Sequence, residues 1–154
     1  MIAKRELRRP RLCVIGTVIL FALLTLACPN RSGDRLTHAH LIEFAGDSAT
    51  DCGHVALGQE FNTANSCVLG AFQEKHSFIV RYDVQGRDSR LVVGLAANDQ
   101  GRVVIVKYDS EGWDPHQLQS DDRLADNGHV LLKPCPAESK LHKTQTGYLS
   151  CFDY

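Results

Sequence analysis

Residues 76–110, HSFIVRYDVQGRDSRLVVGLAANDQGRVVIVKYDS, hold three runs in which side-chain character alternates, and two of the runs are rich in β-branched residues. The first run places Phe78, Val80 and Tyr82 on one face and polar residues such as Arg81 and Asp83 on the other. A period of two residues is typical of a strand with one buried face. The pattern therefore predicts a sheet with one apolar and one solvated face.

Short polar segments separate the three runs, at residues 85–88 and 98–101. Each segment contains a glycine, which can supply the positive φ that tight hairpin loops require. Connections this short force neighbouring strands to run antiparallel. The stretch therefore predicts a three-stranded antiparallel meander.

A helix is expected from Asn62 or Thr63, either of which suits the N-cap, to about Lys75. Its apolar stripe has helical spacing and should lie on the apolar face of the sheet: Ala64, Cys67, Val68, Ala71 and Phe72. Residues 129–133 and 147–152 are predicted to form two further short strands that extend the sheet as a C-terminal hairpin. The predicted fold class is α+β, a small antiparallel sheet on one main helix.

The N-terminus has the pattern of an export signal. Basic residues between Lys4 and Arg11 precede an apolar run over residues 12–27. A transmembrane anchor is the alternative, but the run is shorter than the ~20 residues that a spanning helix needs. We therefore expect a signal peptide over residues 1–27.

The residues Leu24-Thr25-Leu26-Ala27-Cys28 stand at the end of that run. This segment resembles the lipobox of bacterial lipoproteins. The resemblance implies that Cys28 is lipidated and becomes the first mature residue, so that the chain contacts the membrane through this anchor and faces the periplasm. The alternative is ordinary signal-peptidase cleavage, which leaves Cys28 as a free thiol.

The part expected to remain after cleavage is acidic. Residues 1–27 include five basic residues and Glu6, so residues 28–154 hold 12 Lys and Arg against 17 Asp and Glu, a net charge of −5. Nucleic-acid binding needs a concentrated basic face, so we expect no nucleic-acid partner. Polar residues 28–50 are predicted to be a tether, with a short edge strand as the alternative for residues 41–45, and residues 51–154 a single globular domain.

Four cysteines remain in the predicted domain, and an even number in an exported chain indicates disulfides. Of the three possible pairings, we favour Cys52–Cys67 and Cys135–Cys151, which would clamp the helix and the last two strands. Neither spacing is CxxC, so a redox role is not expected.

The sequence contains no GxSxG, HExxH or phosphate-binding glycine loop. His38 and His40 have no third ligand near them in the sequence, so no metal or cofactor is expected. The main hypothesis is a non-catalytic binding or inhibitor module with an envelope protein partner. One alternative is a small hydrolase that uses Ser110 or Asp109 with a histidine (His54, His116 or His129), and another is a purely structural lipoprotein.

Candidate binding residues follow the strands. Val80-Arg81-Tyr82-Asp83 recurs as Val106-Lys107-Tyr108-Asp109, which suggests a polar rim containing Tyr82, Tyr108 and Asp109, or simply two amphipathic strands that end in a turn-forming Asp. Trp113, the single tryptophan, stands in a Gly- and Pro-flanked loop. This residue has two interpretations: an interface anchor that contacts a partner, or a ring folded back over the core.

Overall fold

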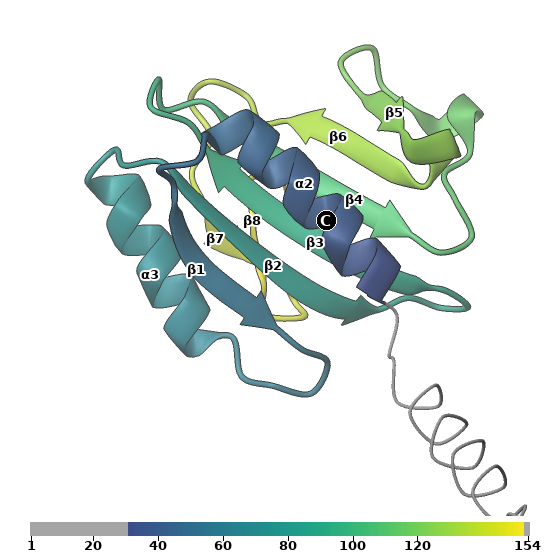
Figure 1. Ribbon diagram of the computed structural model, residues 1–154, viewed down its shortest axis with the longest axis horizontal. Helices are drawn as coiled ribbons and strands as arrows, with labels where there is room; N and C mark the ends of the chain where they lie inside the picture. Colours follow the sequence, from purple (N-terminus) through teal and green to yellow (C-terminus); the bar gives the residue numbers. More distant parts are fainter. Residues whose placement is uncertain (1–30, 153–154) are drawn as a thin grey trace, which may run out of the picture. The chain divides into compact units, whose positions relative to one another are not determined.

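The computed structural model describes residues 31–152 (Figure 1). The predicted signal peptide and Cys28 lie outside the described residues. The fold class is α+β, as predicted, and residues 31–152 form a mixed sheet of six strands, a separate two-stranded sheet and two α-helices. Two short 3-10 helices, η1 (Pro115–Gln117) and η2 (Asp126–Gly128), lie in the connections around β5.

The main sheet has the strand order β1-β2-β3-β4-β6-β5. Its strands are β1 (Thr50–Val55), β2 (Phe78–Gln85), β3 (Arg90–Ala97), β4 (Val103–Asp109), β5 (Arg123–Ala125) and β6 (Val130–Pro134). The predicted meander is confirmed as β2-β3-β4, with antiparallel pairing throughout. The sheet is larger than the sequence predicts, because β1 adds in parallel to β2 and the pair β6-β5 adds beside β4.

One face of the sheet carries helix α3 (Asn62–Gln73) and the hairpin of β7 (His142–Lys143) and β8 (Leu149–Ser150). The predicted stripe is confirmed, since Ala64, Val68 and Ala71 are buried against the sheet. The predicted cap is wrong: Phe61 occupies the N-cap position, in helical conformation, and no side chain caps the helix.

The opposite face is covered by helix α2 (Arg31–Ala45), which lies in front of the sheet in Figure 1. This corrects two predictions, because residues 31–45 of the expected tether are folded and the expected solvated face is buried. The reason is that β3 and β4 carry apolar residues on both faces, as in a sheet covered on both sides. Leu41 and Ala45 of α2 pack on this second set: Ile79, Val92, Ala96, Val104 and Val106.

The two C-terminal strands do not pair with each other, which corrects the predicted hairpin. β6 joins the main sheet between β4 and β5, whereas β8 pairs with β7 in the second sheet. A hairpin is still present, but its first strand is β7, which the sequence pattern did not indicate.

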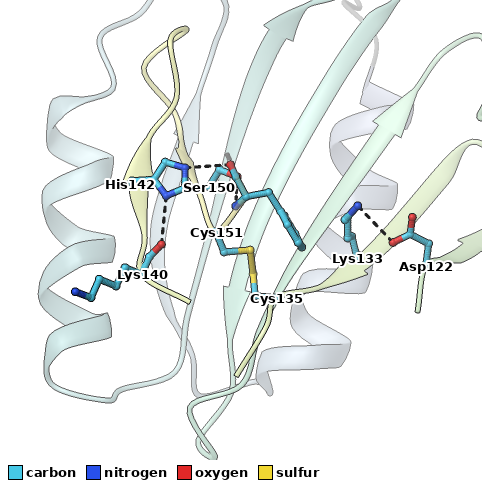
Figure 2. Close-up of a disulfide and its surroundings, with 8 residues drawn as sticks. Asp122, Lys133, Cys135, Lys140, His142, Ser150 and Cys151 are labelled. Atoms are coloured by element: carbon cyan, nitrogen blue, oxygen red, sulfur yellow. Dashed lines mark hydrogen bonds and ion pairs between the residues drawn. A yellow bond between two sulfur atoms is a disulfide. The ribbon is translucent and has the colours of Figure 1, made fainter. Parts of the chain in front are cut away.

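Both predicted disulfides are present. Cys52–Cys67 joins β1 to α3 with the Cα atoms 5.6 Å apart. Cys135–Cys151 joins the segment after β6 to the end of β8, at 5.9 Å (Figure 2). Disulfides are typical of exported proteins that fold in an oxidising compartment. Of the two described helices, neither has the length and apolar character to cross a membrane.

Candidate functional site

A cavity of about 460 Å³ opens at the end of the sheet where β4 begins and β6 ends. In Figure 1 this is the end toward which the arrowheads of β3 and β6 point and at which α2 finishes. The walls come from α2, α3, the β3–β4 turn, the outer strands and the segment after β6. The volume lies within the ~300–1,000 Å³ range of small-molecule sites. We call this the sheet-end cavity.

The β3–β4 turn that forms one wall is held by the side chain of Asn98. Asn98 Oδ1 accepts from the backbone N–H groups of Gln100 at 3.1 Å and Arg102 at 3.0 Å. The Asn98 N–H donates to the Arg102 carbonyl at 3.0 Å, and Gly101 takes the left-handed conformation that closes the turn, with φ +72°. The backbone at Arg102 is therefore fixed at the edge of the cavity.

The Cys135–Cys151 disulfide forms a second wall, since both cysteines line the cavity. The N–H of Cys135 donates to the carbonyl of Val103 at 2.9 Å, so the segment after β6 is also bound to the start of β4. Figure 2 shows the disulfide between the C-terminal hairpin, which carries His142 and Ser150, and the strand that carries Lys133. A covalent bond and a backbone hydrogen bond thus hold this wall in place.

The apolar residues that line the cavity lie at the edges of the two hydrophobic cores. Phe44 and Leu132 border the core under α2, whereas Phe72, Val103 and Leu141 border the core under α3. All five side chains are half-buried. They present to the cavity apolar surface that neither core covers, which is the usual lining of a small-molecule site.

The charge of the lining is positive. Among the described residues that line the cavity, Arg102 and Arg123 are charged and no carboxylate is present. Neither guanidinium has a hydrogen bond or an ion pair with another described residue, and both arginines are exposed. Since residues 28–154 are acidic overall, two unpaired arginines at one cavity are a local departure from the charge of the chain.

Two of the four predicted binding residues are core residues, which corrects the predicted polar rim. Tyr82 is fully buried under α3, and Tyr108 is 8% exposed under α2. The pairing register explains why the repeat does not form a rim. Tyr82 pairs with Val93, and Val93 pairs with Lys107, so these three side chains point to the same face of the sheet. Tyr108 is one residue further along β4 and therefore points to the opposite face.

The other two predicted residues, Asp109 and Trp113, lie outside the described lining of the cavity. Asp109 Oδ1 accepts from the N–H of Glu111 at 2.9 Å, as a turn-forming Asp does. The backbone N–H of Trp113 donates to the carbonyl of Gly128 at 2.8 Å. Its ring is partly buried, and the indole Nε1 is buried without a hydrogen-bond partner among the described residues.

The predicted alternative of a hydrolase required an imidazole beside Ser110. The hydroxyl of Ser110 instead accepts from the backbone N–H of Arg90 at 3.1 Å. His129 Nδ1 lies 3.0 Å from the Asp109 carbonyl, and His54 Nε2 lies 3.0 Å from Asp83. Within residues 31–152, no histidine is hydrogen-bonded to the Ser110 hydroxyl.

A second group of charged side chains joins α2 to the first two strands. Arg81 donates to Asp34 of α2 at 3.1 Å and to Asp51 of β1 at 3.4 Å. His54 lies between Asp83, at 3.0 Å, and Asp34, at 3.7 Å. Asp34 of α2 thus contacts Arg81 and His54 of the strands, so the group fastens α2 to the sheet. Within residues 31–152, no three His, Cys, Asp or Glu side chains are placed to hold a metal ion.

Sequence reasoning missed Arg102 and Arg123. The available signal was weak, because an arginine in a hairpin turn and another in a polar loop have no special spacing. No family model, curated protein or solved structure matches the chain.

Proposed function

We propose that this chain is an exported, non-catalytic binding module of the bacterial envelope and that its ligand occupies the sheet-end cavity. The observation that carries the proposal is a cavity of about 460 Å³. Its lining is largely apolar and also contains two arginines without a partner among the described residues. Apolar walls with a few polar groups are typical of binding sites. The signal pattern and the two disulfides support export.

The cavity is a better ligand site than the predicted surface around Trp113. Tyr82 and Tyr108 are buried, so that surface lacks two of its four expected contacts. The indole N–H of Trp113 also points into the protein rather than toward a partner. We therefore assign the proposed binding role to the sheet-end cavity.

The ligand proposal is tested by native mass spectrometry of the oxidised protein extracted in mild detergent from bacterial envelopes. We expect a bound small molecule on the wild type. Ala137, an exposed residue of the cavity wall, gives the blocking variant Ala137→Trp, which should lose the molecule. The matched control is Gln145→Trp, in the exposed β7–β8 turn, which should keep it. Ligand retained on Ala137→Trp, or a protein partner in place of a small molecule, would overturn the proposal.

We place the lipid anchor on Cys28, on the strength of the lipobox resemblance. The intact mass of the mature chain tests it directly. A chain that begins at Cys28 and carries the mass of a diacylglyceryl group is expected, and Cys28→Ser should release the protein from the membrane fraction. An unmodified Cys28 thiol on the mature chain would show ordinary signal-peptidase cleavage instead.

A further inference from the structure

We propose that the ligand of the sheet-end cavity is an amphiphile with an anionic head group, carboxylate or phosphate, that Arg102 and Arg123 bind while its apolar part lies over the outer strands. This inference rests on the proposed function, since it names the chemistry of the ligand in the same cavity.

Both arginines lie on the face of the sheet that α2 covers. Arg123 of β5 pairs with Leu132 of β6, and paired residues share a face. Leu132 borders the core under α2, which places Arg123 on that face. Arg102 directly precedes β4 and stands two residues before Val104, which is buried under α2. The Asn98 hydrogen bond to the Arg102 carbonyl continues the β3–β4 pairing to this residue, so extending the alternation of β4 by one residue places Arg102 on the same face.

The sheet order explains how residues distant in sequence reach one cavity. β6 lies between β4 and β5, so Arg102 approaches from the start of β4 and Arg123 from the outer edge strand. Strands are about 4.8 Å apart, which puts β5 roughly 10 Å across the sheet from β4. Arg123 is level with Val106, so it also lies four residues, roughly 13 Å, along the strands from Arg102. Two long guanidinium side chains can therefore approach one anion from opposite sides of the cavity.

The surface between the arginines is apolar. Val104 pairs with Pro134, and Val106 pairs with Leu132 in the next row on this face. Phe44, near the end of α2, lines the same cavity. α2 runs across the middle of the sheet and leaves β5 and β6 beside it, as Figure 1 shows. A ligand that reaches both arginines must therefore contact apolar side chains on the way.

The charge of the site selects an anion. A guanidinium binds carboxylate or phosphate through two parallel hydrogen bonds, which is stronger than a neutral contact. The described lining has no carboxylate to compete for the arginines or to attract a cation. Two arginines in an acidic domain do not make the extended basic face that nucleic acid needs. A small anion with an apolar part therefore matches both the two arginines and the apolar lining of the cavity.

The test is a calorimetric titration of the oxidised protein with ligands that share one chain and differ in the head group: decanoate, decyl phosphate, decanol and decyltrimethylammonium. Inorganic phosphate is titrated alone. Charge-assisted hydrogen bonds predict that at least one anionic ligand binds about tenfold or more tighter than decanol, and that the cation does not bind. The ranking of decanoate against decyl phosphate distinguishes a carboxylate from a phosphate ligand.

Three variants identify the site. Arg102→Ala and Arg123→Ala should each weaken binding of the anionic amphiphile by about tenfold. Arg87→Ala is the matched control, because Arg87 is an exposed arginine in the other hairpin turn of β3 and does not line the cavity. It should bind as the wild type does. Since all three arginines are exposed, thermal unfolding of the variants should match the wild type and exclude misfolding.

The outcomes separate this inference from the proposed function. One outcome is that decanol binds the wild type as tightly as decanoate does but does not bind Ala137→Trp. This result would overturn the anionic head group and leave the cavity as a binding site. Inorganic phosphate that binds as tightly as decyl phosphate would overturn the apolar contact. Tighter binding of the cation would overturn the charge argument. If none of the ligands binds, the inference about the ligand's chemistry is wrong, and native mass spectrometry with Ala137→Trp decides separately whether the cavity is the ligand site.

Discussion

The hydroxyl of Tyr82 on β2 donates a 2.9 Å hydrogen bond to Oδ1 of Asn65 on α3, and both residues are buried. Asn65 Nδ2 in turn donates to the carbonyl of Gly147 in the β7–β8 turn at 2.9 Å. One buried amide therefore connects the sheet, the helix and the C-terminal hairpin. Burial raises the pKa of the Tyr82 phenol, so the hydroxyl stays protonated and can donate at ordinary pH.

Tyr82→Phe should lower the free energy of unfolding by about 1–3 kcal/mol, because it leaves the amide oxygen of Asn65 buried without a donor. Urea unfolding measures the change. Tyr148→Phe is the matched control, since the Tyr148 ring lies 5.9 Å from that of Tyr82 but its hydroxyl has no hydrogen bond to a described residue. The control should change stability by less than about 0.5 kcal/mol. Equal losses in the two variants would mean that the Asn65 hydrogen bond adds nothing.

Gly94→Ala should destabilise the packing of α2 on the sheet. A Cβ at Gly94 would lie 2.7 Å from Cδ1 of Leu41 and 2.8 Å from Cγ2 of Thr37, closer than carbon atoms approach. Overpacking of this kind costs about 1–3 kcal/mol, which thermal or urea unfolding measures.

Gly70→Ala is the control for this substitution. Gly70 lies inside α3, where an added Cβ has no atom within 4 Å, so the same change should stabilise by about 0.5–1 kcal/mol through helix propensity. A Gly94→Ala protein as stable as the wild type would show that α2 can shift away from β3 without cost.

The parts of the fold that the sequence predicted are those with local signals. Strands β2 to β4 are joined by short turns that contain Gly86 and Gly101, so their pairing follows from chain distance alone. The stripe of α3 is similarly local, with Ala64, Val68 and Ala71 spaced for one helix face. Of the four cysteines, each pairs with the one that comes next to it in chain order.

Helix α2 was missed because its own sequence is mostly polar and its described buried positions, Gly33, Thr37, Leu41 and Ala45, include only one large apolar residue. The better signal lay in the strands. Val92 and Ala96 on β3 are apolar on the face that was expected to be solvated, so some other element had to cover them.

The cavity could not be predicted, because it depends on pairing between distant segments. Arg102 and Arg123 line one cavity only because β6 lies between β4 and β5, although β5 precedes β6 in the chain. Periodicity indicates which residues share a face of a strand, but it carries no information on which strands are neighbours beyond a short turn.

Thr37→Val should stabilise the protein by roughly 1 kcal/mol. Thr37 is fully buried under α2, and its hydroxyl has no hydrogen-bond partner among the described residues. A buried polar group without a partner costs free energy that an apolar group of the same shape avoids. Thr63→Val, at an exposed position of α3, is the control and should be close to neutral. A destabilised Thr37→Val protein would mean that the hydroxyl has a partner in solution.

The stability of the protein should rise with pH above about pH 8 because of Lys107. Burial, and to a smaller extent the positive charge of Lys133, lower the pKa of Lys107 to about 8, whereas Asp122 opposes the shift. The unfolded lysine keeps a pKa of about 10.4. Between these values the unfolded state binds more protons than the folded state, so the free energy of unfolding increases with pH.

Urea unfolding from about pH 7 to about pH 10 tests this expectation, with Lys107→Met as the comparison. The wild type should gain stability relative to the variant as the pH rises through this window. At higher pH the raised pKa of Tyr82 acts in the opposite direction, because the unfolded phenol loses its proton first. Parallel curves for the two proteins would contradict a lowered pKa at Lys107.

The two disulfides should have similar effects on stability and different effects on ligand binding. They span 15 and 16 residues, so the chain-entropy model gives each about 3 kcal/mol. Replacing both cysteines of either pair by alanine should therefore lower the free energy of unfolding by similar amounts. Only Cys135 and Cys151 belong to the described lining of the cavity.

Loss of the Cys135–Cys151 pair removes the covalent link of the segment after β6, which forms one wall of the cavity, and leaves the backbone hydrogen bond from Cys135 to Val103 to hold that wall. We expect decanoate to bind several-fold more weakly to this double variant, measured at a temperature where it remains folded, because the wall must be ordered when the ligand binds. The variant without Cys52–Cys67 should bind as the wild type does. Equal weakening in the two variants would trace the effect to general loss of stability, whereas unchanged binding in both would show that the disulfide wall does not contact the ligand.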